Sequence, residues 1–234
     1  MCDSPAYDPV GVAGHLFIVD GDLNRISCDA VLVPTDQWLG VTTLWDSTVE
    51  PGSRDRLADV VDSPWRVVQD PGLAGRGPQV WFGNVGSIAD EPEPYVDVAE
   101  EYVRLAARSL RPDRPIPRVA LNVVGSGAGG MGHDKGKLIE LLVQRLSAVA
   151  DTEHADVVLV TWGLKQYSAA QRARHRHDAA DASRRTLHSA AEGQAPRAAV
   201  LPRSFPDQDH LLHRNGTANR PVDRVRQDPA SGAR

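Results

Sequence analysis

The sequence predicts an α/β fold in three layers, a mixed sheet flanked by helices, followed by a disordered C-terminal tail. Three observations lead to this prediction. Apolar segments of strand length alternate with amphipathic segments of helical length between residues 10 and 168, which we expect to form one domain. The segment 30–34, Ala-Val-Leu-Val-Pro, is apolar without alternation, as is typical of a strand covered on both faces. A glycine-rich stretch joins a strand to a helix within 118–149.

The first half of the chain carries three expected strands. Residues 15–20 are rich in β-branched and aromatic side chains and end in a Gly-Asp turn, which predicts the first strand. The second strand is expected at 30–34. Residues 37–77 mix tryptophans with Pro, Gly and Asp, so we expect loops there with at most one short helix. The third strand is expected at 79–85.

The second half continues the alternation. Residues 95–110 have apolar side chains at helical spacing, and Pro112 ends this predicted helix. A strand is expected at 118–124 and an amphipathic helix at 135–149. The apolar run at 155–162 predicts the fifth strand, so strands and helices alternate through the whole domain.

The composition changes after the fifth strand. Residues 168–185 can continue as a polar, arginine-rich helix, but from Leu187 onward there is no apolar period, and lysine is absent after Lys165. We therefore expect 169–234 to be an arginine-rich, mostly disordered tail. A further hypothesis makes this tail a frame-shifted remnant, translated out of frame from a GC-rich gene. The other reading frames of the coding DNA test that idea.

Charge and cysteine content exclude several classes of function. The formal net charge of -5 provides no general attraction to nucleic acid or to anionic membranes, so neither is expected as a partner. Cys2 and Cys28 are too few for a disulfide framework or a cysteine zinc site. His175 and His177 point in different directions on a helix, so we expect no metal site. Without a long apolar run or a signal peptide, we expect a cytoplasmic protein, and its oligomeric state stays open.

The strongest local pattern is the loop that follows the strand at 118–124. Glycines allow backbone N–H groups to approach a phosphate, and the N-terminus of the next helix adds partial positive charge. No Gly-Lys-Ser/Thr ends the loop, so it is not a Walker loop. Both an anion cradle and a plain strand-to-helix connection remain open. The loop residues are Gly125, Ser126, Gly127, Ala128, Gly129 and Gly130.

A second pattern lies near the N-terminus, where the sequence Asp-Gly-Asp-Leu at 20–23 precedes Cys-Asp-Ala-Val-Leu-Val at 28–33. With the glycine-rich loop, these residues resemble the ADP-ribose-binding macrodomain family, over about residues 15–165. The loop itself resembles that of macrodomains related to the terminal ADP-ribose glycohydrolases. The resemblance implies that Asp22, beside Leu23, accepts a hydrogen bond from the adenine amino group. It also implies that the backbone of the glycine-rich loop surrounds the diphosphate and distal ribose. The alternative is that Asp22 only caps a turn.

The departures from the family concern catalysis. Asp36 stands where many hydrolytic members carry an asparagine, and residues 40–45 lack the glycines of the first phosphate loop. The acid of the glycohydrolase-like members has its equivalent near Gly129. The nearest carboxylate is Asp134, which suits a helix N-terminus better. We therefore include Asp36 in the expected ligand site and assign no catalytic residue.

The leading hypothesis is a nucleotide-binding module that binds or senses ADP-ribose or a related NAD metabolite, with a small nucleotide as its partner and no required cofactor. The domain also resembles the N-terminal part of longer bacterial proteins that continue into a sirtuin-like NAD-consuming domain. That likeness implies the sensor part of a larger NAD-linked defence protein. The alternatives are a hydrolase that removes ADP-ribose from a macromolecule, with Asp36 or Asp134 activating water, and a protein-interaction scaffold without a ligand.

Overall fold

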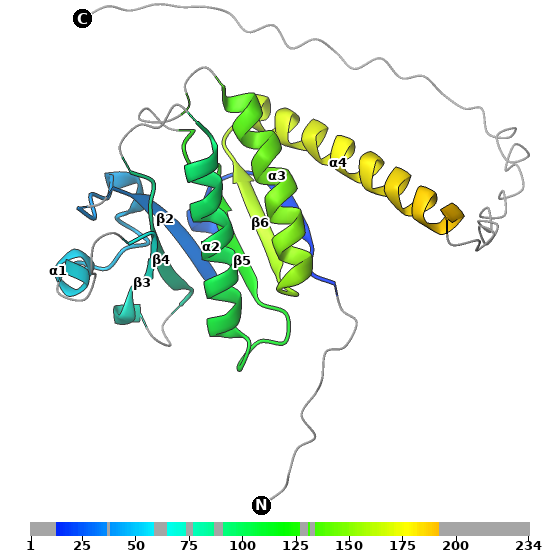
Figure 1. Cartoon of the computed structure of the whole chain (residues 1–234). Coiled ribbons are helices and arrows are strands. Elements are labelled where there is room, and N and C mark those ends of the chain that lie inside the picture. Colours follow the sequence, from blue (N-terminus) through cyan, green and yellow to red (C-terminus); the bar gives the residue numbers. More distant parts are fainter. Residues whose placement is uncertain are drawn as a thin grey trace, which may run out of the picture.

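A six-stranded sheet forms the centre of the computed structural model (Figure 1). The strand order is β1-β6-β5-β2-β4-β3, and all neighbouring strands are parallel except β3 and β4. The strands are β1 Leu16–Asp20, β2 Ala30–Thr35, β3 Val67–Gln69, β4 Gln79–Asn84, β5 Arg118–Asn122 and β6 Asp156–Thr161. The structure describes residues 13–36, 38–58, 65–73, 77–86, 91–126, 131 and 134–191.

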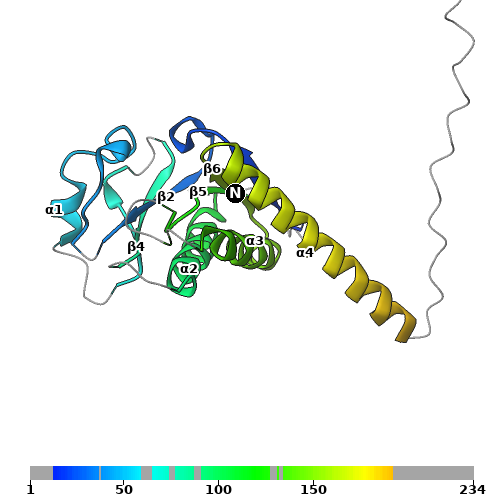
Figure 2. The ribbon, with the colours of Figure 1, turned by 90° about the horizontal axis from the view of Figure 1, so that it is seen from above.

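The helices lie on both faces of the sheet (Figure 2). They are α1 Ser53–Ala58, α2 Glu93–Leu110, α3 Lys135–Thr152 and α4 Leu164–Ala191, with short 3-10 helices η1 Leu23–Arg25, η2 Thr43–Trp45 and η3 Pro71–Leu73. The expected mixed sheet flanked by helices is therefore confirmed, and the five expected strands and the two central helices are all present. None of the described helices is long and apolar enough to cross a membrane.

The two faces of the sheet have separate cores. On one face, α2 and α3 bury their apolar stripes against β5 and β6. The hydroxyl of Tyr102 on α2 donates to the carbonyl of Ala120 on β5 at 3.1 Å, so this buried polar group is paired. On the other face, short segments replace long helices, and Leu23, Val33 and Trp45 pack together there. The loops on this second face lead into the carboxyl edge of the sheet.

The strand β3 was missed in the sequence. It has three residues, all half-buried, and pairs antiparallel with β4 at the edge of the sheet. Three residues are too few to show a strand period. Its existence depends on hydrogen bonds from β4, which no local pattern reveals.

The domain boundary expected at 168 falls inside α4, and residues 169–191 are helical. The first turns of α4 belong to the domain: Ala170 and Ala173 are buried, and Arg174 donates to the backbone carbonyl of Leu16 on β1 at 2.5 Å. Alanine at these positions allows α4 to approach α3 and β1 closely. Beyond Ala173 no described side chain of α4 is buried, and the helix projects away from the sheet (Figures 1 and 2). The rest of the expected tail, 192–234, lies outside the described residues.

Candidate functional site

The carboxyl ends of four parallel strands meet at one edge of the sheet. Asp20 pairs with Thr161 in the β1–β6 register. Asn122 pairs with Val160 in the β5–β6 register, and Val31 pairs with Ala120 in the β2–β5 register. If these registers are extended beyond the strand ends, the loops that follow β1, β6, β5 and β2 begin at the same level along the strand direction. The expected site residues Asp22, Gly125 and Asp36 thus lie along a single edge of the sheet.

Asp22 begins η1 and caps it. Its Oδ1 accepts from the backbone N–H of Asn24 at 3.0 Å, and its Oδ2 lies 3.7 Å from Nε of Arg25. The turn-capping role considered as an alternative is therefore present. The carboxylate is still 39% exposed and has acceptor positions beyond the capping bond. The side chain of Leu23 is buried in the second core and borders a cavity on that face of the sheet.

The first residues of the glycine-rich loop have a fixed conformation. Gly125 has φ +75°, and a Cβ there would lie 2.7 Å from the ring of Tyr95 on α2. The N–H of Ser126 donates to the carbonyl of Val123 at 3.2 Å, and the N–H of Met131 donates to Gly125 at 2.9 Å. The loop is thus anchored at both ends, and α3 begins four residues after Met131. Residues 127–130, also expected to bind, lie outside the described residues.

Asp36 turns its carboxylate into its own loop. Oδ1 accepts from the backbone N–H of Trp38 at 2.9 Å and from that of Gly40 at 2.8 Å. The hydroxyl of Thr35 donates to the carbonyl of Gly40 at 3.0 Å and closes the same loop. Asp36 therefore shapes the loop after β2. The direct ligand contact expected for this residue stays a prediction.

Trp162 is a candidate site residue that the sequence analysis did not single out. It follows β6 at the carboxyl edge and is 76% exposed. Its turn is tied to the loop after β1, because the N–H of Gly21 donates to the carbonyl of Thr161 at 3.0 Å. Trp162 thus stands in the loop next to that of Asp22. The available signal was a tryptophan at the end of the fifth expected strand, where a strand covered on both faces leaves the core.

Solved structures resemble this arrangement. A variant of the Oceanobacillus iheyensis macrodomain matches 73% of this chain and 96% of its own, with a TM-score of 0.55 and 11% sequence identity. The chain has the macrodomain fold. The O. iheyensis macrodomain with ADP matches 73% of this chain and 95% of its own, with a TM-score of 0.55 and 13% identity. The Trypanosoma brucei macrodomain in complex with ADP-ribose matches 70% of this chain and 72% of its own, with a TM-score of 0.52 and 12% identity. No protein-family model and no curated protein matches the chain.

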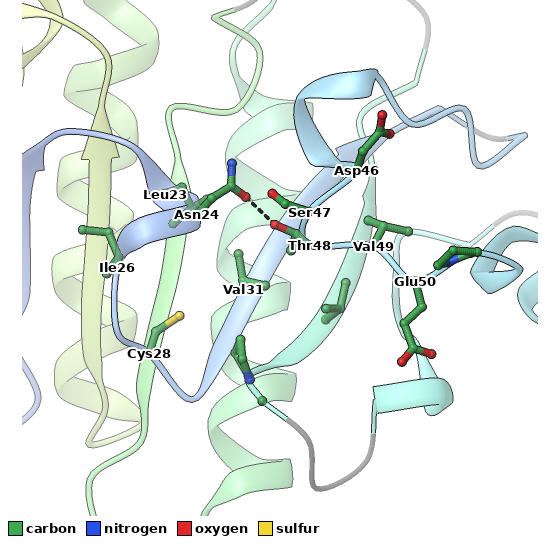
Figure 3. A pocket seen from close by; sticks show the side chains of 14 residues that line it. Leu23, Asn24, Ile26, Cys28, Val31, Asp46, Ser47, Thr48, Val49 and Glu50 are labelled. Atoms are coloured by element: carbon green, nitrogen blue, oxygen red, sulfur yellow. Dashed lines mark hydrogen bonds between the residues drawn. The ribbon is translucent and has the colours of Figure 1, made fainter.

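Away from the carboxyl edge, this macrodomain fold holds a cavity of about 410 Å³ on the sheet face that carries the short segments (Figure 3). Val31 and Val80 line it near the amino ends of β2 and β4. Asn24 and Thr48 line it and point toward each other, and the hydroxyl of Thr48 donates to the side-chain oxygen of Asn24. Leu23 and Asn24, which follow Asp22, border the cavity, whereas Gly125 and Ser126 of the glycine-rich loop do not.

Cys28 lines the same cavity. Burial, and then the neighbouring charge of Asp29, raise the pKa of the Cys28 thiol to about 11, so the thiol stays protonated near neutral pH. A protonated thiol is a poor nucleophile and a poor metal ligand. Among the residues that the structure describes, no three His, Cys, Asp or Glu side chains are grouped to hold a metal ion.

Asp134, the other acid considered for catalysis, occupies the N-cap position of α3 but makes no side-chain cap bond there. It is exposed. A carboxylate in this position interacts favourably with the dipole of α3, which agrees with the helix N-terminal role expected for Asp134. Catalytic residues therefore remain unassigned.

Proposed function

We propose that the chain binds ADP-ribose or a related NAD metabolite along the carboxyl edge of its sheet. The observation that carries this proposal is the alignment of three loops at one height: Asp22 after β1, Trp162 after β6 and Gly125 after β5. Ligands of open α/β sheets generally bind beyond the carboxyl ends of the strands.

The diphosphate binds at the loop after β5. Gly125 has positive φ and leaves no room for a side chain beside the ring of Tyr95, and the hydrogen bonds of Ser126 and Met131 fix the ends of the loop. Backbone groups whose conformation is already fixed, as at Gly125 and Ser126, lose little entropy when an anion binds. The N-terminus of α3 follows directly and contributes partial positive charge, which compensates for the negative net charge of the chain.

The adenine base binds next to this loop, between the loops of β6 and β1, the two strands that follow β5 in the sheet order. The partly exposed carboxylate of Asp22 accepts from the exocyclic amine, as the residue's remaining acceptor capacity allows. Trp162, exposed in the adjacent loop, offers a face on which the base stacks. A charged acceptor beside an apolar ring is the combination that a purine base needs.

The structural neighbours support this choice of ligand. The O. iheyensis macrodomain is known with ADP, and the T. brucei macrodomain with ADP-ribose. We further propose that the domain acts as a sensor within a larger, NAD-linked protein of the sirtuin-like kind. Residues 174–191 of α4, which project from the sheet without a buried side chain among the described ones, are compatible with a helix that leads to another domain.

Titration calorimetry of the full chain with ADP-ribose, ADP and inorganic phosphate tests the binding proposal. We expect ADP-ribose to bind more tightly than ADP, and phosphate to compete weakly. Absence of binding for all three ligands would contradict the proposal and leave a scaffold role. Release of ADP-ribose from an ADP-ribosylated protein would instead identify the chain as a hydrolase.

A further inference from the structure

Exposed apolar side chains gather at the carboxyl edge. Among the large hydrophobic residues that the described part of the chain exposes, Trp38, Leu44 and Trp162 lie in the segments after β2 and β6, and Leu164 is the first residue of α4. Trp162 is placed beside the proposed adenine site. Trp38, which is 67% exposed, lies on the other side of the glycine-rich loop, because β5 lies between β6 and β2. The proposed diphosphate site therefore has one exposed tryptophan in the loop on each side.

The loop that carries Trp38 is held firmly. Asp36 accepts from the backbone N–H groups of Trp38 and Gly40, and the carbonyl of Asp36 accepts from Leu39 at 3.1 Å. Leu39 adopts φ +58°, a conformation that costs a leucine energy, while its side chain is buried in the second core. Hydrogen bonds and packing thus impose a strained conformation on Leu39, while the preceding residue, Trp38, is left in solvent. The backbone of Trp38 is thus fixed by hydrogen bonds, while its indole ring is exposed to solvent.

We propose that Trp38 stacks on a second planar ring of the ligand, so that the site prefers a dinucleotide, with a ring at each end of the diphosphate, over ADP-ribose. This inference rests on the proposed function. Neighbouring strands lie about 4.8 Å apart, so the loops of Trp162 and Trp38 are separated by about 10 Å, with the loop of Gly125 between them. A diphosphate at Gly125 would carry one ring toward each tryptophan.

The exposed indole of Trp38 also favours a positive charge on the second ring of the ligand. The nicotinamide ring of oxidised NAD is planar and positively charged, and tryptophan is the side chain that attracts a cation most strongly through its ring face. The described neighbours of Trp38 add a carboxylate, Asp36, and no positive charge within the loop 38–44. Oxidised NAD therefore fits this end of the site better than reduced NAD, whose nicotinamide is neutral.

Calorimetry of the full chain with oxidised NAD, reduced NAD and ADP-ribose tests the inference. We expect oxidised NAD to bind about tenfold more tightly than ADP-ribose, consistent with one stacked ring. Trp38→Ala should abolish this advantage and leave the affinity for ADP-ribose unchanged, whereas Trp38→Phe should keep most of it. Leu44→Ala, which removes an exposed side chain from the same loop, is the matched control and should behave as the wild type.

The outcomes separate the two proposals. If ADP-ribose binds but oxidised NAD binds no more tightly, the role of Trp38 is wrong and the proposed function stands. Equal losses for both ligands in Trp38→Ala would likewise overturn the role in discrimination. If neither ligand binds the wild type, the proposed function fails, and the inference fails with it.

Discussion

Asp20, the last residue of β1, accepts a hydrogen bond from the backbone N–H of Gly163 in the turn after β6, at 2.7 Å. Gly163 has φ +84°, so the turn has the left-handed conformation that glycine adopts easily. The bond joins the loop that contains Asp22 to the turn that contains Trp162. An exposed carboxylate of no evident catalytic use thus fixes the two halves of the proposed adenine site relative to each other.

The first prediction concerns this bond. Asp20→Ala should lower the affinity for ADP-ribose about fivefold, the effect of about 1 kcal/mol expected from one lost hydrogen bond, while the protein stays folded. Asp20→Asn keeps an acceptor oxygen and should bind nearly as the wild type. Calorimetry measures both affinities. Equal losses in the two variants would assign the effect to charge and not to the position of the turn.

The second prediction concerns Gly125. A methyl group at this position would meet the buried ring of Tyr95, and alanine is strained at φ +75°. Gly125→Ala should therefore lower the free energy of unfolding by about 2 kcal/mol and abolish ADP-ribose binding. Gly136→Ala, inside α3 with nothing near the added methyl, is the control and should unfold at the same or a higher urea concentration. A stable Gly125→Ala variant that binds ADP-ribose normally would contradict the account of this loop.

The third prediction separates the loop-forming role of Asp36 from its charge. Asp36→Ala removes the acceptor for the N–H groups of Trp38 and Gly40, so the preference for oxidised NAD over ADP-ribose should fall as it does in Trp38→Ala. Asp36→Asn retains an acceptor oxygen but loses the charge, so it should keep more of that preference than Asp36→Ala does. The ratio of the two affinities is the measurement. Loss of the preference in Asp36→Asn would indicate that the carboxylate acts through its charge.

The fourth prediction concerns Cys28. Its pKa is raised to about 11 from the ordinary value of 9.0, because burial disfavours the thiolate. The unfolded chain releases this proton at a lower pH than the folded chain. The contribution of the protonated Cys28 thiol to the free energy of unfolding is therefore fully present below pH 9 and is lost as the pH rises from 9 to about 11. Urea unfolding across this range should show the decline in the wild type, and a smaller decline in Cys28→Ala.

The same thiol should react slowly in the folded state. In a Cys2→Ser background, where Cys28 is the single cysteine, a pKa of about 11 leaves about a hundredfold less thiolate at pH 8 than the ordinary value does. Reaction with a disulfide reagent at pH 8 should therefore accelerate strongly on addition of urea. Equal rates with and without urea would show that Cys28 is not protected.

The sequence predicted those parts of the fold that depend on local periodicity. The continuous apolar run of β2 and the spaced apolar residues of α2 each have a pattern that burial imposes directly. The strand at Val67–Gln69 and the attachment of α4 through Ala170 have no such pattern, because both depend on partners far away in the chain. Composition alone separates a polar helix poorly from a disordered tail.

The site was predictable in the same uneven way. Glycine at 125 and aspartate at 22 follow strand ends, and parallel strands bring such positions to one edge. The sequence does not show that Asp36 bonds to its own loop, since that depends on the turn imposed by the buried side chain of Leu39. Nor does it show which tryptophans are exposed. Trp45 and Trp81 are buried core residues, whereas Trp38 and Trp162 lie in solvent.

The central claim is that the ligand lies along the carboxyl edge and not in the cavity on the sheet face. Amide chemical shifts of the isotope-labelled full chain, recorded during titration with ADP-ribose, test this most directly. We predict that Asp22, Ser126 and Trp162 shift together with one saturation curve, while Thr48 in the cavity of Figure 3 does not move. Shifts centred on Thr48, with the edge residues unchanged, would contradict the account.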